Sequence, residues 1–435
     1  MTDLLLKPAK LSGDVTIPPS KSMAHRAIIA ACLAEGKSII TNIDLSDDII
    51  ATIEGMRAFG AEITLLGDGQ RKKLIIEGVS KKQSTKNRLI DANESGSTLR
   101  FFIPIATLFD GETRFIGRGK LGMRPLDTYE KIFNEQGLHF QPSGTPELDL
   151  TVGGRLKAGR YEMAGNVSSQ FITGLLFTLP LLTGDSVIAI TTEVESIGYL
   201  ELTLEVLRAF GISVTYNETE REFLIPGGQR YRAQTYTVEG DYSQAAFFLS
   251  AGALGNAVRV TGLKPDSNQG DKGIIEILEQ LGAVMHSEGD AVTASAPNGL
   301  KGGATIDGAQ VPDIIPVSAL VACLSPGETQ IINLKRLRIK ESDRLEATKE
   351  ELAKLGADIR VVGEELHITG IASLHGDATG WSHKDHRMAM MLAIASTVCE
   401  NEIIIKDAEY VSKSYPTFWQ EFEALGGQIS EWNLG

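Results

Sequence analysis

The segment LAKLGADIRVV, residues 352–362, joins the end of a predicted helix to a predicted strand through one glycine. Leu352 and Leu355 have helical spacing, and Gly356 allows the left-handed backbone with which many helices end. The run ADIRVV is typical of a strand, and LHITGI at residues 366–371 completes a hairpin signature. The predicted local unit is therefore a helix, a glycine and a hairpin.

This unit recurs along the chain. An amphipathic helix ends in a glycine and a strand-like segment follows in MRAFGAEITLL, FNEQGLHFQ, LRAFGISVTY, LEQLGAVMHS, LAKLGADIRVV and FEALGGQIS, with the glycines at 60, 137, 211, 282, 356 and 426. Successive glycines are 70 to 77 residues apart, which is too far for a solenoid repeat. Because each unit holds more strand than one βα pair needs, we expect an α/β fold with mixed sheets.

The length of the chain predicts more than one domain. Its 435 residues exceed the usual size of one hydrophobic core, so we expect two domains of three units each. The predicted crossing lies near residues 238–240, between the third and fourth units. Residues 1–20 precede the first motif and fit either domain.

Composition excludes several classes of protein. A net charge of −14 argues against a surface for nucleic acid or anionic membranes. Cys32, Cys323 and Cys399 form no metal-binding or disulfide pattern and are expected to be buried thiols in a reducing compartment. The longest apolar run of interest, residues 171–183, contains Pro180 and is too short to span a bilayer. We expect a cytoplasmic protein.

A cluster of charge precedes the helix of the first segment. In KRLRIKESDRLEATKEEL, residues 335–352, seven of the first ten side chains are charged. Lys340 and Arg344 would share a helix face if both were helical. Glu341, between two cations, is the kind of carboxylate that transfers protons in enzymes. A solvated helix N-terminus with internal salt bridges is the alternative.

Two further stretches suit small anions. PPSKSMAHR, residues 18–26, is expected to open a helix with Lys21 and Arg26 near its N-terminus, where an anion is favoured. ESGSTLR, residues 94–100, places hydroxyl side chains around a glycine and lets backbone N–H groups approach a phosphate or carboxylate. Capping and turn formation are the alternatives for both stretches.

A glycine-rich loop follows. FIGRGKLGMRP, residues 115–125, contains a formal GxGxxG, but prolines interrupt the segment after it, so we discount a dinucleotide fingerprint. Arg118, Lys120 and Arg124 make the loop cationic instead, as in a mobile lid that binds anions.

The remaining candidates also lie near predicted helix starts. GNVSSQ, residues 165–170, offers neutral donors to an anion, and Ser196 and Tyr199 could face the same site. Asp313 lies alone within an apolar run and is either a helix cap or a base. Lys413 is expected to begin the last helix.

The cations share one location in the predicted structure. All lie at or near helix starts, in both halves of the chain: Lys21, Arg26, Arg124, Lys340, Arg344, Arg387 and Lys413. A cation there opposes the helix dipole unless it shares an anion with it. The pattern therefore predicts a site between two domains for highly anionic small molecules.

The motifs, in this order, resemble the 5-enolpyruvylshikimate-3-phosphate synthase family. They are PPSKSMAHR, ESGSTLR, GMRPLD, NVSSQF, GDYSQAAFF, VPDIIP, RIKESDRL, DHRMAM and KSYPTFW, and the resemblance runs from about residue 8 to residue 420. It implies two domains of three βαβαββ repeats each, in the inside-out α/β barrel architecture of the enolpyruvyl transferases. Residues 21–239 would form one domain, and residues 240–435 the other, joined by residues 1–20.

The resemblance also implies a reaction and its residues. The enolpyruvyl group of phosphoenolpyruvate moves to the 5-hydroxyl of shikimate 3-phosphate through a tetrahedral ketal phosphate, in aromatic amino-acid biosynthesis. Shikimate 3-phosphate would contact Lys21, Ser22, Arg26, Ser168, Ser169, Gln170, Ser196, Tyr199, Asp313 and Lys340. Phosphoenolpyruvate would contact Lys21, Gly96, Arg124, Gln170, Arg344, Arg387 and Lys413. Asp313 and Glu341 would act as base and proton donor, with Lys21 also catalytic. No cofactor, metal or macromolecular partner is expected, and the enzyme would be a monomer.

Two positions depart from the family pattern, and three rival functions stay open. Glu94 stands where many members of the family carry asparagine, and Arg336 where some members do. Glu94 could pair with Arg100. Gly96 is retained, which predicts inhibition by glyphosate. The rivals are an enolpyruvyl transferase acting on UDP-N-acetylglucosamine, a noncatalytic anion-binding module and a nicotinamide-dependent oxidoreductase. The first usually carries a cysteine in the mobile loop, and residues 115–124 contain none.

Overall fold

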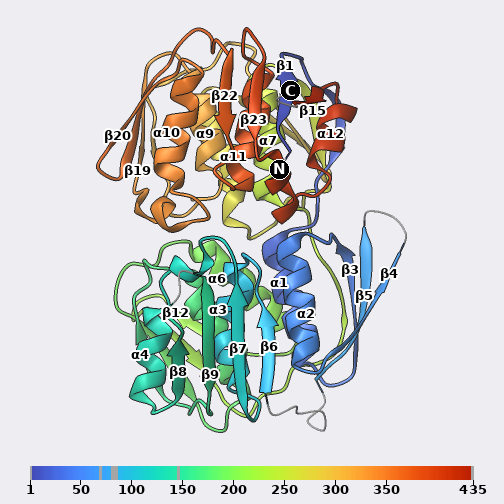
Figure 1. Ribbon diagram of the computed structural model, residues 1–435, viewed down its shortest axis with the longest axis vertical. Coiled ribbons are helices and arrows are strands. Elements are labelled where there is room, and N and C mark those ends of the chain that lie inside the picture. The colour runs from blue at the N-terminus through green and yellow to red at the C-terminus, as the bar shows by residue number, and fades with distance from the viewer. Residues whose placement is uncertain (1, 68–70, 80–86, 145–146, 433–435) are drawn as a thin grey trace. The chain divides into compact units, whose positions relative to one another are not determined.

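The chain forms two compact units. The structure, a computed structural model, describes residues 2–67, 71–79, 87–144 and 147–432. One unit, which we call the continuous unit, comprises residues 21–238. The other, which we call the split unit, combines residues 1–20 with residues 239–435. Figure 1 shows helices and strands mixed in both units.

The described strands of each unit form three four-stranded sheets. In the continuous unit the orders are β14 (Thr235–Thr237), β3 (Lys37–Ile43), β5 (Lys72–Glu77), β4 (Glu62–Leu66); β6 (Asn87–Asp91), β7 (Glu112–Gly117), β9 (Leu148–Gly153), β8 (His139–Pro142); and β10 (Arg160–Met163), β11 (Ser186–Ile190), β13 (Glu222–Ile225), β12 (Thr215–Asn217). In the split unit they are β16 (Val284–Glu288), β17 (Ala291–Ser295), β15 (Ala257–Thr261), β2 (Ser12–Thr16); β18 (Thr305–Asp307), β19 (Glu328–Ile332), β21 (Glu365–Thr369), β20 (Asp358–Val362); and β22 (Ala378–Trp381), β23 (Ile403–Lys406), β1 (Leu4–Lys7), β24 (Gln428–Glu431).

Every sheet combines parallel and antiparallel pairs. In the sheet that contains β19, for example, β18 pairs with β19 in parallel, and β19 and β20 both pair with β21 antiparallel. The predicted α/β fold with mixed sheets is confirmed. Three of the pairings join distant parts of the chain: β14 lies parallel to β3, β2 lies parallel to β15, and β1 lies between β23 and β24.

The six predicted helix–glycine–strand junctions are all present. Each glycine has a positive φ, between 68° and 104°, at positions 60, 137, 211, 282, 356 and 426. In the copy at Gly356, the N–H of Ala357 donates to the carbonyl of Leu352 at 3.1 Å, and the same bond recurs in the other five copies. This is the hydrogen bond of a Schellman motif, which satisfies a carbonyl at the helix end and turns the chain toward the next strand.

Three of the helices in the split unit are completely buried. The helices are α1 (Lys21–Leu33), α2 (Asp47–Ala58), α3 (Gly96–Ala106), α4 (Asp127–Glu135), α5 (Ser169–Thr178) and α6 (Ile197–Ala209) in the continuous unit, and α7 (Tyr242–Ala253), α8 (Ile274–Gln280), α9 (Ile315–Cys323), α10 (Arg344–Lys354), α11 (His386–Ser396) and α12 (Phe418–Ala424) in the split unit. Every residue of α7, α9 and α11 is buried, and the three helices contact one another (Figure 1). A helix that is apolar on all sides must be enclosed, so these helices form the core of the split unit.

One buried side chain ties the N-terminal segment into this core. Asn256 accepts from the backbone N–H of Leu11 at 2.7 Å, and its Nδ2 donates to the carbonyl of Ala251 at 2.9 Å and to Thr397 Oγ1 at 3.0 Å. The amide therefore joins the residue that precedes β2, helix α7 and the end of α11.

Asn256→Ala should destabilise the protein. The substitution leaves the buried N–H of Leu11 and the carbonyl of Ala251 without this partner, and we expect a loss of about 3 kcal/mol. Urea unfolding monitored by far-UV circular dichroism measures the loss. Asn401→Ala, at an exposed asparagine that donates to the carbonyl of His375, is the control. Equal midpoints for the two variants would contradict this role of Asn256.

Candidate active site

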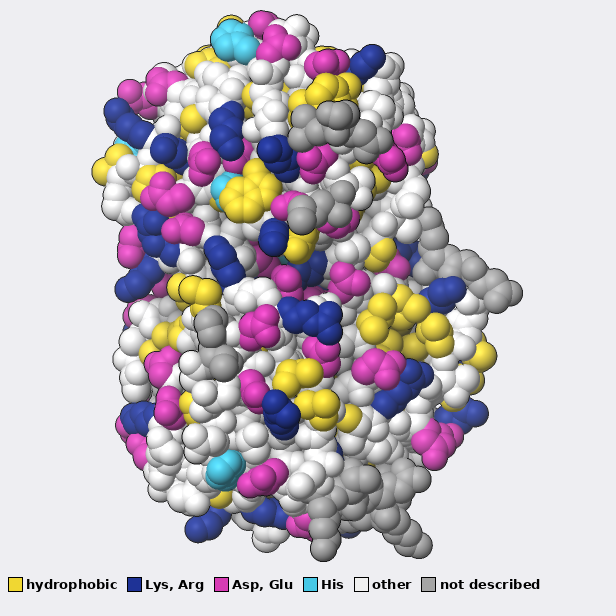
Figure 2. Space-filling model, in the orientation of Figure 1, with side chains coloured by type: hydrophobic (Ala, Val, Ile, Leu, Met, Phe, Trp, Pro, Cys, Tyr) yellow, Lys and Arg dark blue, Asp and Glu magenta, His cyan; other side chains and the backbone are white. Residues whose placement is uncertain are grey.

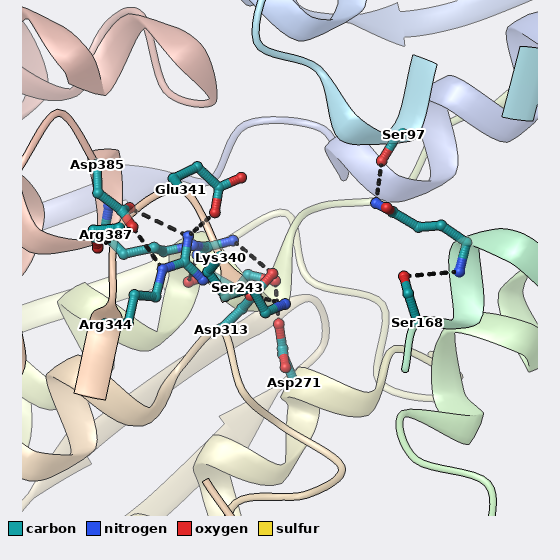
Figure 3. A network of polar contacts seen from close by, with 12 residues as sticks. Ser97, Ser168, Ser243, Asp271, Asp313, Lys340, Glu341, Arg344, Asp385 and Arg387 are labelled. Atoms are coloured by element: carbon teal, nitrogen blue, oxygen red, sulfur yellow. Dashed lines mark hydrogen bonds and ion pairs between the residues drawn. The ribbon is translucent and has the colours of Figure 1, made fainter. Parts of the chain in front are cut away.

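A buried arginine holds three carboxylates in the split unit. Arg344 is the first residue of α10, and its side chain is 1% exposed. Its Nε donates to Asp385 Oδ2 at 2.7 Å, its Nη1 to Asp313 Oδ1 at 2.7 Å and its Nη2 to Glu341 Oε2 at 2.8 Å (Figure 3). Burial alone would lower the pKa of Arg344, but the three carboxylates hold that pKa well above its ordinary value. The guanidinium is therefore permanently charged and fixed in direction.

Asp313 is an ionised acceptor and not a helix cap. The N-cap residue of α9 is Ile314, which makes no side-chain cap. The Asp313 carboxylate accepts from Lys340 Nζ at 3.1 Å and from Arg344, and Arg387 Nη2 lies 3.5 Å from its Oδ2. Burial would raise the pKa of Asp313, but these three cations outweigh burial and hold the pKa well below its usual value. The first of the two sequence interpretations of Asp313 is therefore wrong.

Lys340 and Arg344 meet at Asp313 without sharing a helix face. A 3-10 helix, η4 (Lys335–Ile339), ends before Lys340, which has an extended backbone, and α10 begins four residues later. Glu341 lies in this short non-helical link, so its carboxylate turns back to Arg344. The condition for a shared helix face, that both residues be helical, is therefore not met, although the two cations do come together.

Two further cations of the split unit are almost completely buried. Arg387 follows the N-cap Asp385, whose carboxylate accepts from the Arg387 N–H at 2.9 Å. Lys413 ends a 3-10 helix, η5 (Ala408–Lys413), and α12 begins only at Phe418. The expectation that Lys413 begins the last helix is wrong, because Pro416 separates it from that helix and cannot donate a backbone hydrogen bond.

In the continuous unit, α1 carries Lys21, Ser22 and Arg26. Lys21 Nζ lies 2.9 Å from Asp48 Oδ2. Arg26 donates to Thr203 Oγ1 at 2.8 Å and to the carbonyls of Ser22 at 2.8 Å and Tyr199 at 2.9 Å. Burial lowers the pKa of Arg26 to about 10, so the side chain stays charged at neutral pH. The turn from Ser22 to Arg26 thus faces α6, which contains Tyr199.

The starts of α3 and α5 lie together in this unit. A Cβ added at Gly96 would come within 2.6 Å of Arg124 Nη1 and 3.5 Å of Gln170 Oε1. Gln170 Nε2 donates to Ser97 Oγ at 2.9 Å, and Arg100 Nη1 donates to Gln170 Oε1 at 2.8 Å. Helix N-termini, an amide and two guanidinium groups therefore converge, as an anion requires.

Serine side chains complete the polar set of the continuous unit. Ser168 is the N-cap of α5 and accepts from the Gln170 N–H at 3.3 Å, and Ser169 begins that helix. Ser196, the N-cap of α6, is completely buried with a φ of 57°. A left-handed non-glycine residue costs conformational energy and tends to occur where function demands it.

The two departures from the family pattern have defined surroundings. A Cβ added at Gly119 would come within 2.7 Å of Glu94 Oε1, so the Glu94 carboxylate lies against the glycine-rich loop. Arg336 is buried in η4. Burial of Lys340 lowers its pKa, and the positive charge of Arg336 lowers that pKa further. In the loop, only a three-residue 3-10 helix, η1 (Leu121–Met123), follows Gly119, whereas a dinucleotide fingerprint opens a long helix.

The sequence interpretation missed several partners of these residues. Asp48, Thr203 and Asp385 hold Lys21, Arg26 and Arg344 respectively, across 27, 177 and 41 residues. Asp385 was visible only as the acid before a predicted helix. No spacing rule connects the other two with their partners.

Figure 2 shows Lys and Arg side chains interspersed with Asp and Glu. Among the described residues, no helix has the length and apolar character needed to cross a membrane.

Comparisons with known proteins agree over the whole chain. The family model for EPSP synthase (3-phosphoshikimate 1-carboxyvinyltransferase) matches residues 5–422. The chain is 56% identical to the 3-phosphoshikimate 1-carboxyvinyltransferase of Clostridium beijerinckii and 53% identical to that of Clostridioides difficile, with complete coverage of both chains in each case. An EPSP synthase structure from Acinetobacter baumannii superposes with a TM-score of 0.79 at 24% identity, again over both complete chains.

Glu351→Gln should destabilise the segment that positions Asp385. The buried Glu351 carboxylate accepts from Lys354 Nζ at 2.7 Å and from the Trp381 N–H at 2.9 Å, and lies 2.7 Å from His383 Nε2. Burial raises the pKa of Glu351, but these partners outweigh burial and lower it. The stabilisation is therefore present above the unfolded pKa, roughly 4.3, and lost as pH falls through the lower folded pKa.

We expect the variant to lose about 2 kcal/mol at pH 7 and to approach the wild type below about pH 4. Urea unfolding at several pH values measures both. Glu350→Gln, at the exposed neighbour that also pairs with Lys354, is the control. A loss that does not vary with pH would show that the Glu351 charge is not responsible.

Proposed function

The chain belongs to the EPSP synthase (3-phosphoshikimate 1-carboxyvinyltransferase) family, and from this membership we propose that its clustered cations bind two anionic substrates and drive transfer between them. Its reaction moves an enolpyruvyl group from phosphoenolpyruvate to shikimate 3-phosphate, in aromatic amino-acid biosynthesis. We place the transfer at the 5-hydroxyl, with phosphate as leaving group.

Each substrate is assigned its own set of residues, and the two sets share Lys21 and Gln170. We assign shikimate 3-phosphate to Lys21, Ser22, Arg26, Ser168, Ser169, Gln170, Ser196, Tyr199, Asp313 and Lys340. We assign phosphoenolpyruvate to Lys21, Gly96, Arg124, Gln170, Arg344, Arg387 and Lys413. Together the substrates carry roughly five or six negative charges, so cations fixed before binding offset their repulsion without reorganisation. The observation that supports this most is the buried Arg344, already held by three carboxylates.

Two carboxylates that contact Arg344, Glu341 and Asp313, move protons. Glu341, in its acid form, protonates the methylene carbon of phosphoenolpyruvate, which makes C2 electrophilic. The 5-hydroxyl attacks C2 while Asp313 accepts its proton, and a tetrahedral ketal phosphate forms. Glu341 then removes a proton from the new methyl group as phosphate leaves. In the free protein, Lys340 and Arg344 weaken Asp313 as a base. Substrate anions that engage these cations would raise its pKa and make it effective.

We also propose that the protein acts as a monomer in the cytoplasm. Its three cysteines are buried free thiols, as expected in a reducing compartment.

Phosphate release with each substrate omitted in turn tests the reaction. Release should require both substrates, and UDP-N-acetylglucosamine should not replace shikimate 3-phosphate. Glu341→Gln should lower kcat by at least about a thousandfold, because it removes the proton donor, and should leave shikimate 3-phosphate binding intact by calorimetry. Glu346→Gln, one turn into α10 and paired with Arg338, is the control. Turnover by Glu341→Gln would refute the role of Glu341.

Gly96→Ala tests the phosphoenolpyruvate assignment. We expect glyphosate to inhibit the wild type competitively with phosphoenolpyruvate. The added methyl group would displace Arg124 Nη1, 2.6 Å away, and should raise the KM for phosphoenolpyruvate about tenfold, with weaker glyphosate inhibition. Gly273→Ala, where the Cβ would meet only Val311 at 3.4 Å, is the control. Full velocity of the wild type at millimolar glyphosate would overturn the assignment.

A further inference from the structure

A further buried carboxyl lies near the cluster formed by Arg344 and its three carboxylate partners. Asp271 is 3% exposed, in a 3-10 helix, η3 (Gly270–Gly273), that leads into α8. The Ser243 hydroxyl, in the first turn of α7, donates to Asp271 Oδ2. Figure 3 shows both side chains close to Asp313. The mechanism above uses neither residue.

Ser243 connects Asp271 to Arg387. The carbonyl of Ser243 accepts from Arg387 Nη1 at 3.0 Å, while Arg387 Nη2 faces Asp313. The Arg387 guanidinium also lies 6.0 Å from the centre of the Phe247 ring. Ser243 thus binds the Asp271 carboxyl with its side chain and the Arg387 guanidinium with its backbone. The charges of Asp271 and Arg387 therefore lie on either side of one residue.

The charged groups around Asp271 come from four elements. Asp241 is the N-cap of α7, Asp313 precedes α9, and Arg387 lies in α11. Lys272, in η3 itself, turns away to the carbonyl of Pro265. Burial, and then Asp313, raise the pKa of Asp271 to about 6, against the opposing effects of Arg387 and the Ser243 hydroxyl. Asp271 therefore titrates close to neutral pH, while Asp313 stays ionised.

We propose that Asp271 is a positioning residue whose negative charge competes with the substrate anion for Arg387, so that phosphoenolpyruvate binding is coupled to proton uptake by Asp271. The proposal rests on the assignment of Arg387 to phosphoenolpyruvate. An anion that arrives at Arg387 repels the Asp271 carboxylate, and one proton from solvent then binds a carboxyl oxygen. Linkage is reciprocal, so protonation of Asp271 strengthens anion binding by the same factor.

Asp271→Asn separates this charge effect from a packing effect. The amide oxygen can still accept from Ser243, so the shape of the wall is kept and only the charge is removed. We expect the KM for phosphoenolpyruvate to fall about fivefold at pH 8 and to approach the wild-type value near pH 5. The ratio of kcat/KM for variant and wild type should follow a titration centred near pH 6, and this ratio cancels the titration of the substrate phosphates. A ratio that stays constant with pH overturns the proposal.

Calorimetry measures the proton directly. Phosphoenolpyruvate is titrated into the shikimate 3-phosphate complex of Glu341→Gln, which does not turn over, in two buffers of different ionisation enthalpy at pH 7. With a pKa of about 6 in the free protein and a fivefold coupling, the double variant with Asp271→Asn should take up about a quarter of a proton fewer at pH 7. Asp266→Asn, on an acid with an 82% exposed side chain in the same segment, should behave as the wild type. Equal uptake by the double and single variants contradicts the coupling.

Ser243→Ala keeps the proposal testable should Asp271→Asn fail to fold. Loss of the hydroxyl removes a hydrogen bond that stabilises ionised Asp271, so the pKa of Asp271 should rise. The pH dependence of kcat/KM for phosphoenolpyruvate should then have its Asp271 midpoint above pH 6. An unmoved midpoint counts against the coupling. Two other results would refute the proposed function and not the coupling. Wild-type protein without turnover refutes the reaction, and an unchanged KM in Arg387→Ala refutes the assignment of Arg387.

Discussion

The polar cluster of the split unit depends on the buried guanidinium of Arg344. Its charge would be costly in the core without partners, and Asp385, Asp313 and Glu341 supply them from three separate segments. Of the three, Asp313 is kept ionised by Arg344 together with Lys340 and Arg387. Asp385 also caps α11 and so places Arg387. The guanidinium of Arg344 thus orients Asp313 and Glu341, and through Asp385 it contacts the N-terminus of α11.

The two units present their helix N-termini differently. In the continuous unit, α3 and α5 are capped by the neutral side chains of Ser95 and Ser168, so their positive dipole ends remain available to an anion. In the split unit, α7 and α11 are capped by Asp241 and Asp385, which neutralise the dipole. Attraction for anions at these two helix ends must therefore come from cationic side chains, such as Arg387 in the first turn of α11.

Local rules predicted what depends on local sequence. The six helix ends follow from a glycine after an amphipathic run, because glycine readily adopts the left-handed backbone that satisfies a carbonyl of the last turn. The mixed sheets follow from the hairpins. The helix start at Lys413 was wrong, and Lys340 is not helical, so it shares no helix face with Arg344. Charge spacing says little about where a 3-10 segment ends. Asp313 stayed ambiguous, since a cap and a base look alike until the partners of the carboxylate are known.

By itself, the sequence determined the repeated unit, the α/β class, the family and the identity of the clustered cations, because periodicity, glycine positions and ordered motifs are properties of neighbouring residues. Only the tertiary structure decided that β1 completes a sheet with β23 and β24, that Asp48 holds Lys21, and that Asp271 reaches Arg387 through Ser243. These contacts join residues between 27 and 427 positions apart. Their geometry and ionisation arise from burial and charge in the folded core, which no local pattern encodes.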